Sequence, residues 1–488
     1  MIFSFLWKKI EKNMKKLLLP LLILFITTLN SQTPCENGLA GQYPCNGYDL
    51  QVFIPCTDFD ANNANDSWGW TDPEDGTEYA LVGLDNGTAF LDISNPTNPT
   101  YLGKLPTHTT ASLWRDVKVY NNYAFVVSEA GGHGIQVFDL TRLRDVANPP
   151  ETFTEDAHYD GFGGAHNIVI NEETGYAYGV GADFSGGAHF VNIQDPLNPI
   201  GEGGYSSSGY THDAQVVVYN GPDSDYTGKE IYIGSNEDFV TIVDVTDKSN
   251  PQLISNVFYS NTSYTHQGWF TEDLNYFIMG DEIDELDYGF DTRNIVFDFT
   301  DLDNPELAFE YTGPTSATDH NGYVDGDKFY LANYKAGMRV IDISDIANGN
   351  MTETGYFDIF IYGNSAGYDG AWNVYPYFES GNIIISSLVY SDPTYIPGFY
   401  LVKSSSLGIG DNTISNFNIH PNPSSNYVNI SATETQIKTI DVYDLSGKLV
   451  ISNQYNSLKT TNLNISNLSN GIYILKINTK FTSKVVKF

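Results

Sequence analysis

Four histidines occupy the same position in four consecutive units of a repeating sequence pattern. The chain has 488 residues but only nine histidines, so chance placement does not explain four at one position. Neutral imidazoles with carboxylates nearby suit Zn²⁺, Fe²⁺, Mn²⁺ or Cu²⁺. The candidate metal ligands are His166, His212, His266 and His320.

Tryptophan occupies this position in the other three units, and acidic residues occur in the turns that follow. In a propeller, each first strand starts on the same face as the turn between the second and third strands. We therefore expect the histidines to lie on one face among aromatic and charged side chains that bind a ligand. This ligand-binding face consists of Trp68, Trp114, Arg115, Glu129, Asp183, Asp213, Glu237, Asp281, Glu282 and Trp372.

Three interpretations of the histidines stay open from the sequence. They could bind a transition metal that polarises a substrate or activates water. They could also line a binding face without a metal. Alternatively, each could have a structural role by hydrogen-bonding a neighbouring unit. A wide channel could hold the rings too far apart to share one ion. No residue is assigned as catalytic, and a binding protein is favoured over an enzyme. The acidic run 281–287 is a further candidate cation site, for calcium, although such runs are commonly solvated loops.

The histidines belong to units of short apolar strands that recur every 44 to 54 residues. In each unit, one strand ends in an aspartate or asparagine followed by an apolar residue, and Asn-Pro often follows. A period of this length with four strands per unit is typical of a β-propeller. We expect the repeated acidic residue to cap a turn through its own backbone. The phrase occurs at 90–93, 137–140, 190–193, 242–245, 296–299, 340–343 and, in degenerate form, 399–402.

Seven such units predict an all-β fold, a seven-bladed β-propeller. The seventh unit offers three strands, Asn373–Tyr377, Asn382–Leu388 and Gly398–Lys403, and a spare strand, Asp49–Ile54, precedes the first unit. We expect this spare strand to complete blade seven, because closing the ring leaves no unpaired edge.

Three cysteines, Cys35, Cys45 and Cys56, lie in the arm that precedes the first unit. In an oxidising compartment one disulfide is expected, with one thiol left over. The spacing does not fix the pairing, and Cys35 with Cys45 is the candidate. It does not match a zinc site, which usually contains a closely spaced pair.

The first 31 residues have the pattern of an export signal. Lys15 and Lys16 precede a 13-residue apolar run, Leu17–Leu29, which is shorter than the roughly 20 residues of a membrane span. We expect cleavage after Ser31 and no transmembrane span in the mature chain, with a membrane anchor as the alternative. Residues 1–13 read as an extension upstream of the signal.

The C-terminal segment carries three ordered motifs, Asn418–Pro423, Ile440–Lys448 and Leu468–Tyr473, followed by a basic final strand. These motifs resemble the type A C-terminal sorting domain of the type IX secretion system. The resemblance implies a small β-sandwich that engages the type IX secretion machinery through residues 416–488. It also implies export across both membranes to the outer-membrane surface or the extracellular space, with the body anchored or released.

The body, from Cys35 to Ser406, resembles the choice-of-anchor B family, whose repeats are named after a Leu-Val-Ile-Val-Asp phrase. The resemblance implies a surface location and no known reaction. The matching stretches are Trp68–Pro73, Leu113–Val117, Ser128–Ala130, Val243–Asp247 and His266–Trp269.

The distribution of charge also divides the chain into a body and a C-terminal segment. The formal net charge is −36, and residues 411–488 hold seven lysines against four acids, so the acidity belongs to the body. This balance excludes nucleic acid as a partner, because phosphate binding needs clustered basic residues. The expected parts are a signal peptide (1–31), a propeller with its arm (32–406), a linker (407–415) and the sorting domain (416–488). We expect the propeller to bind an extracellular glycan, peptide or small ligand; a metal-dependent enzyme and a structural scaffold are the alternatives.

Overall fold

The structure is a computed structural model that describes residues 32–405, 417–420, 422, 424–432, 436–444, 448–478 and 481–487. These residues fall into two compact units, divided between Ser405 and Ser406. The predicted signal peptide and linker lie outside the described residues. Within the described residues, no helix is long and apolar enough to cross a membrane.

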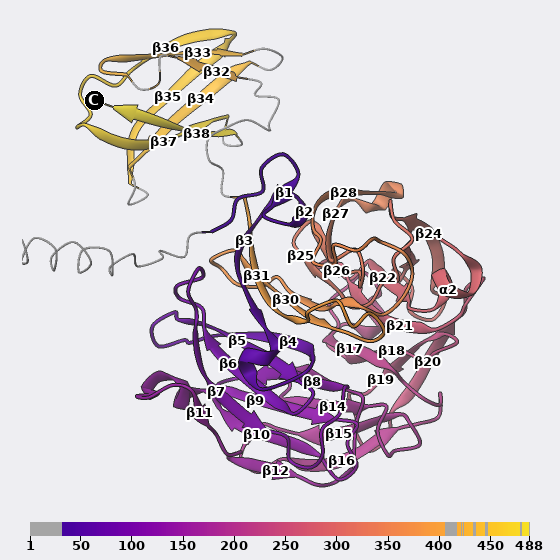
Figure 1. Cartoon of the computed structure of the whole chain (residues 1–488). Coiled ribbons are helices and arrows are strands. Elements are labelled where there is room, and N and C mark those ends of the chain that lie inside the picture. The colour runs from indigo at the N-terminus through magenta and orange to yellow at the C-terminus, as the bar shows by residue number, and fades with distance from the viewer. Residues whose placement is uncertain are drawn as a thin grey trace, which may run out of the picture. The chain divides into compact units, whose positions relative to one another are not determined.

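In the first unit, the described residues form seven β-sheets arranged as the blades of a propeller (Figure 1). Blade one consists of β4 (Ala64–Thr71), β5 (Glu78–Leu84), β6 (Gly87–Asp92) and β7 (Thr100–Pro106), and the short β11 (Glu151–Thr152) adds to β7 in parallel. Blades two and three consist of β8 (Arg115–Tyr120), β9 (Tyr123–Ser128), β10 (Ile135–Asp139) and β12 (Ala157–Tyr159); and β13 (Asn167–Asn171), β14 (Tyr176–Val180), β15 (Ala188–Asn192) and β16 (Ile200–Tyr205). Blades four and five consist of β17 (Asp213–Val218), β18 (Glu230–Ser235), β19 (Val240–Asp244) and β20 (Gln252–Val257); and β21 (Thr265–Phe270), β22 (Tyr276–Asp281), β23 (Arg293–Asp298) and β24 (Glu306–Thr312). Blades six and seven consist of β25 (Gly322–Asp325), β26 (Lys328–Ala332), β27 (Met338–Asp345) and β28 (Asn350–Phe357); and β29 (Gly370–Tyr375), β30 (Asn382–Leu388), β31 (Gly398–Ser404) and β3 (Tyr48–Pro55).

The first strand of each blade contacts the first strand of the next, from β4 to β8 and onward until β29 returns to β4. These strands therefore line the centre of the ring. The middle strands β5, β18 and β30 are buried along their whole length, because a neighbouring blade covers each face of the sheet. The prediction of a seven-bladed propeller is confirmed.

The ring is closed by a strand from the N-terminal arm. β3 pairs with β31 in an antiparallel register that joins Tyr48 to Ser404 and Pro55 to Gly398. The predicted closing strand, Asp49–Ile54, is therefore confirmed and is one residue longer at each end. Just before it, β1 (Leu39–Ala40) and β2 (Tyr43–Asn46) extend blade six through β28.

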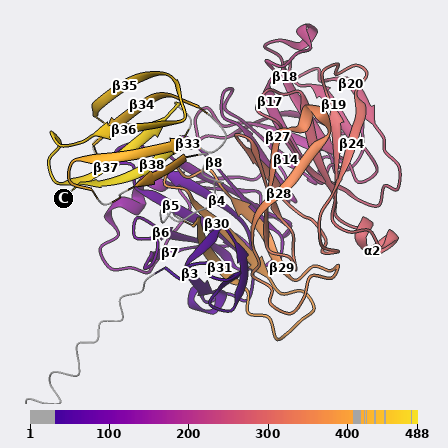
Figure 2. The same ribbon diagram turned by 90° about the horizontal axis from the view of Figure 1, so that it is seen from above.

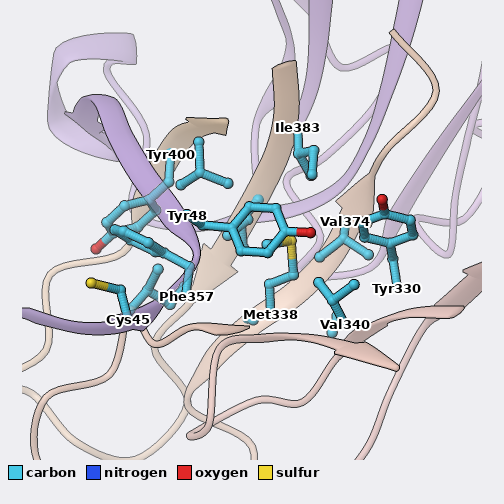
Figure 3. Close-up of a cluster of buried hydrophobic side chains, with 14 of the residues drawn as sticks. Cys45, Tyr48, Tyr330, Met338, Val340, Phe357, Val374, Ile383 and Tyr400 are labelled. Atoms are coloured by element: carbon cyan, nitrogen blue, oxygen red, sulfur yellow. The ribbon is translucent and has the colours of Figure 1, made fainter. Parts of the chain in front are cut away.

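This arm packs into an apolar cluster between blades six and seven, where Cys45 and Tyr48 lie among Met338, Phe357 and Tyr400 (Figure 3). Cys35 forms a disulfide with Cys45, and Cys56 is a buried free thiol.

The repeated acidic residue caps a turn, as the sequence predicts. In all six clear units, its Oδ1 accepts a hydrogen bond of 2.8–3.1 Å from the backbone N–H two residues further on. This closes an Asx turn at the end of the third strand. The capping residues are Asp92, Asp139, Asn192, Asp244, Asp298 and Asp342.

The described residues of the second unit form two small antiparallel sheets. They are β32 (Phe417–His420), β33 (Tyr427–Ala432) and β36 (Thr460–Asn464); and β35 (Leu449–Leu458), β34 (Ile437–Tyr443), β37 (Gly471–Ile477) and β38 (Phe481–Lys487). Both sheets contribute apolar residues to one core, which includes Val428, Ile440 and Leu475. The arrangement is compatible with a β-sandwich.

Candidate functional site

Each of the four histidines lies at or just before the first strand of its blade. Because first strands of neighbouring blades are in contact, one register in consecutive blades brings the rings together. The ring centroids are 4.1 Å apart for His166 and His212, 4.2 Å for His212 and His266, and 4.3 Å for His266 and His320. All four side chains are buried. We call these four residues the histidine cluster.

Three of the four rings are held through Nδ1. His166 Nδ1 lies 2.6 Å from Glu129 Oε1, while Nδ1 of His212 and of His320 donate to the backbone carbonyls of His266 (3.2 Å) and Trp372 (2.5 Å). The bonds of His212 and His320 join each histidine to the next blade. This is the structural role that the sequence left open for these residues. A neutral ring that donates from Nδ1 keeps a lone pair on Nε2 for a ligand.

His266 differs from the other three. Neither of its ring nitrogens has a hydrogen-bond partner among the described residues, although the side chain is almost fully buried. Its Nε2 lies 3.8 Å from Glu282 Oε2, and His320 Nε2 lies 3.8 Å from Glu282 Oε1. One ligand atom from each of these three residues lies within 4.8 Å of the other two. Metal–ligand bonds are about 2.0–2.2 Å, so small movements would let the three share one ion.

The protonation of the cluster suits a metal. Burial lowers the pKa of His320 to about 3, and burial followed by the neighbouring imidazoles lowers the pKa of His212 and of His266. The rings of His212, His266 and His320 are therefore neutral, which metal ligation requires. Burial raises the pKa of Glu282 to about 7, and a hydrogen bond from Tyr334 opposes this rise.

Tyrosines surround the cluster. The Tyr334 hydroxyl donates to Glu282 Oε1 at 2.6 Å, and its ring lies 4.9 Å from that of His320. The Tyr264 ring lies 5.2 Å from His212, and the charges of Glu129 and Glu237 act on Tyr210. These tyrosines were not predicted. The signal that could have found two of them is the phrase Tyr-Thr-His, which occurs at 210–212 and again at 264–266.

The structure places the three predicted tryptophans in different surroundings. The ring of Trp372 lies 4.3 Å from His320, in the cluster as expected. Trp68 lies elsewhere: it contacts Tyr323 and Tyr375, and Tyr323 follows His320 by three residues along the blade. The structure therefore places Trp68 against other aromatic rings and not beside the histidines. Trp114 is 37% exposed at the surface.

The predicted charged residues also lie in different surroundings. Asp281 accepts hydrogen bonds from Tyr259 and from the backbone of 263–264, so it anchors a loop. Arg115 is buried and donates to the Leu84 carbonyl and Thr107. Asp183 is exposed and accepts from the Gly163 backbone. The backbone of Glu237 pairs with that of Thr265, which lies between Tyr264 and His266 at the edge of the cluster.

Asp213 lines a cavity of about 140 Å³ with Trp68, Lys118, Trp269 and Tyr323. Burial, followed by repulsion from Asp116, raises the pKa of Asp213 to about 7. Lys118 binds Asp116 and Asp66 at 2.5 and 3.0 Å. The four histidines are not among the residues that line this cavity, and the sequence did not indicate it.

Comparisons with known proteins agree with this architecture. Residues 418–488 match the secretion system C-terminal sorting domain, and the LVIVD repeat matches residues 77–107, 114–133, 227–258 and 323–358. No curated protein matches the chain.

Similar solved structures include PorZ, an essential bacterial surface component of the type IX secretion system of Porphyromonas gingivalis. It shows 12% identity and a TM-score of 0.44 over 88% of this chain, which spans 59% of the length of PorZ. A protein from Lactobacillus plantarum shows 13% identity and a TM-score of 0.43 over 81% of this chain and 98% of that one.

The sorting domain indicates export to the outer-membrane surface or the extracellular space, through the type IX secretion machinery. The chain is thus a secreted surface β-propeller protein with LVIVD repeats and a type IX sorting domain.

Proposed function

We propose that this exported propeller is a binding protein whose histidine cluster holds a divalent transition-metal ion. His266, His320 and Glu282 are the ligands. The observation that carries the proposal is the buried ring of His266, neither nitrogen of which has a hydrogen-bond partner among the described residues. A buried polar atom without a partner is costly, and an ion bound at Nε2 would satisfy that nitrogen.

The surroundings of the three ligands support this assignment. Two imidazoles and one carboxylate form a common donor set for Zn²⁺, Fe²⁺ and Mn²⁺. Tyr334 fixes the Glu282 carboxylate, which is the role that partners of metal ligands usually have. Three protein ligands leave coordination positions for a ligand from outside. We propose that an extracellular glycan, peptide or small molecule binds there through an oxygen donor, against the aromatic rings of Trp372 and Tyr264.

A metal-dependent enzyme is the second candidate. It is favoured by one contact, the 2.6 Å bond between His166 Nδ1 and Glu129. A carboxylate that holds one nitrogen of a histidine leaves the other able to accept a proton, as a general base does. The test is turnover of a candidate substrate that depends on metal and falls in a His166→Gln variant.

We also propose membership of the choice-of-anchor B family for the body, with a mature propeller of residues 32–406. The LVIVD matches support the repeats of that family, and the sorting domain supplies an anchoring or release signal. Mass spectrometry of the exported protein would give both ends of the mature body. A start far from residue 32 would contradict the cleavage site.

Metal analysis tests the proposed site. The purified chain should contain close to one equivalent of Zn²⁺, Fe²⁺ or Mn²⁺ by plasma mass spectrometry. His266→Ala and His320→Ala should each remove most of it, because each deletes one of three ligands. His189→Ala changes a histidine of blade three that belongs to no group of potential metal ligands among the described residues, and it is the matched control. Metal contents that are the same in the wild type and in both cluster variants would refute the proposal.

A further inference from the structure

The cavity that Asp213 lines lies in the central channel of the propeller. Its walls come from the first strands of blades one to six, of which β4 and β8 lie side by side (Figure 2). We call this space the channel cavity. A space of about 150 Å³ can hold a molecule the size of benzene, so the channel cavity, at about 140 Å³, can hold a small organic molecule. Its aromatic and charged lining residues are Trp68, Lys118, Glu172, Asp213, Trp269 and Tyr323.

The channel cavity extends away from the histidine cluster. His166 comes just before β13, whereas Glu172 directly follows this strand. At about 3.3 Å per residue, the two positions are roughly 20 Å apart along the chain. Glu172 is exposed, and it also lines a wider hollow of about 470 Å³ that shares Trp68 and Val119 with the channel cavity. A ligand can therefore enter past Glu172 without passing the histidines.

Three aromatic rings contribute to the wall. The ring centroid of Tyr323 lies 5.0 Å from that of Trp269 and 5.9 Å from that of Trp68. Both tryptophans are only partly buried although they lie in the channel, so part of each side chain faces open space. The Lys118 ammonium lies 4.7 Å from the centroid of Trp68, within the range of a cation–π contact. This wall therefore already accommodates one alkylammonium group.

Acidic side chains outnumber basic ones at the channel cavity. Lys118 is its one basic lining residue, and its salt bridges go to Asp116 and Asp66, at 2.5 and 3.0 Å. Asp213 is partly exposed and accepts a hydrogen bond at Oδ1 from the Ala214 backbone, at 2.7 Å. In the described part of the chain, no salt bridge joins Asp213 or Glu172 to a basic side chain. The cavity therefore offers two carboxylates that lack a salt-bridge partner.

We propose that the channel cavity binds a small organic cation, an ammonium group carried on an apolar or aromatic body. Asp213 and Glu172 supply the negative charge, while the three aromatic rings pack against the body and attract the cation through their π-systems. An anionic ligand is disfavoured because the acids outnumber the one lysine. The formal net charge of −36 also draws cations toward the protein. This site uses no metal, goes beyond the function proposed above and does not depend on it.

Ligand titration of the whole chain tests the proposal. EDTA is present throughout, so that no metal in the histidine cluster can take up an amine. The probes are benzylammonium and cyclohexylammonium, and benzyl alcohol and cyclohexanol are their uncharged counterparts of the same shape. Each ammonium probe should bind with a stoichiometry of one by calorimetry and change the tryptophan fluorescence, since Trp68 and Trp269 line the cavity. Each alcohol should bind at least about tenfold more weakly than its counterpart.

Two neighbouring acids provide a matched pair of variants. Glu172 lines the cavity, whereas Glu173 is exposed and does not line it. Glu172→Gln should weaken ammonium binding about threefold, because the lost charge is at the solvent-exposed entrance. Asp213→Asn should weaken it at least about tenfold, because a charged partner inside the channel is lost. Glu173→Gln should bind like the wild type.

Three results would overturn the proposal. The first is the absence of saturable binding by either ammonium probe, and the second is an alcohol that binds as tightly as its ammonium counterpart. The third is undiminished binding in both Glu172→Gln and Asp213→Asn, which would place the cation elsewhere on the acidic surface. None of these results bears on the transition-metal site, because metal content is measured on protein that has not been exposed to EDTA.

Discussion

At the scale of single residues, four histidines at one register have three different environments. A carboxylate holds His166, backbone carbonyls of the next blade hold His212 and His320, and no described residue holds His266. The register therefore serves two purposes, because Nδ1 ties blades together while Nε2 stays available. One histidine can therefore have a structural role through Nδ1 and a functional role through Nε2.

A fifth histidine should make the fold sensitive to acid. Burial, aided by the charge of Arg115, lowers the pKa of His133 to about 4 from its usual 6.5. The unfolded chain therefore binds this proton more readily, so stability from this group is present above pH 6.5 and is lost as pH falls toward 4. We expect a loss of about 3 kcal/mol in the free energy of unfolding over this window.

Urea unfolding at pH 7 and pH 4 measures this loss. His133→Gln cannot take up the proton, so its stability should fall by less than that of the wild type over the same window. An equal fall in both proteins would show that His133 does not contribute.

At the scale of the elements, the Asx turn after each third strand was predictable because it depends on a side chain and its own backbone.

Asp92→Ala should lower the free energy of unfolding by about 1 kcal/mol, the usual value of one such hydrogen bond. Asp92→Asn keeps the acceptor, as Asn192 does in blade three, and should be near neutral. Urea unfolding compares the two; similar losses would mean that the turn bond contributes nothing.

The strands were predictable because the repeat supplies seven versions of one pattern. The predicted Asn382–Leu388 matches β30, and the closing strand differs by one residue at each end. The surroundings of Trp68 could not be predicted, because its contacts with Tyr323 and Tyr375 come from other blades. The position of Tyr334 beside Glu282 was beyond the sequence as well, since it depends on how a loop in one blade folds against the next.

Removal of the closing strand tests the architecture. Deleting residues 48–55 would leave β31 with an unpaired edge and remove Tyr48 from the apolar cluster between blades six and seven. We expect the cooperative thermal transition to be lost, as followed by circular dichroism. A deletion variant that melts like the wild type would show that the ring does not need this strand.

At the scale of the whole molecule, the two units have separate roles and separate cores. Deleting residues 418–488 should leave the protein in the periplasm, because the matched sorting domain is lost. Cell fractionation measures this, and the thermal midpoint of the propeller should stay unchanged. Surface export of the truncated chain would show that the signal lies elsewhere.

The pairing of β3 with β31 also concerns the order of events in folding. Tyr48 and Ser404 are neighbours in the sheet but lie 356 positions apart in the chain. Joining such distant segments carries a large entropic cost and is slow relative to local pairing. Synthesis proceeds from the N-terminus, so six blades can form before the last strand of the seventh exists. A truncated propeller therefore stays open, and the ring closes only when the whole propeller has been synthesised.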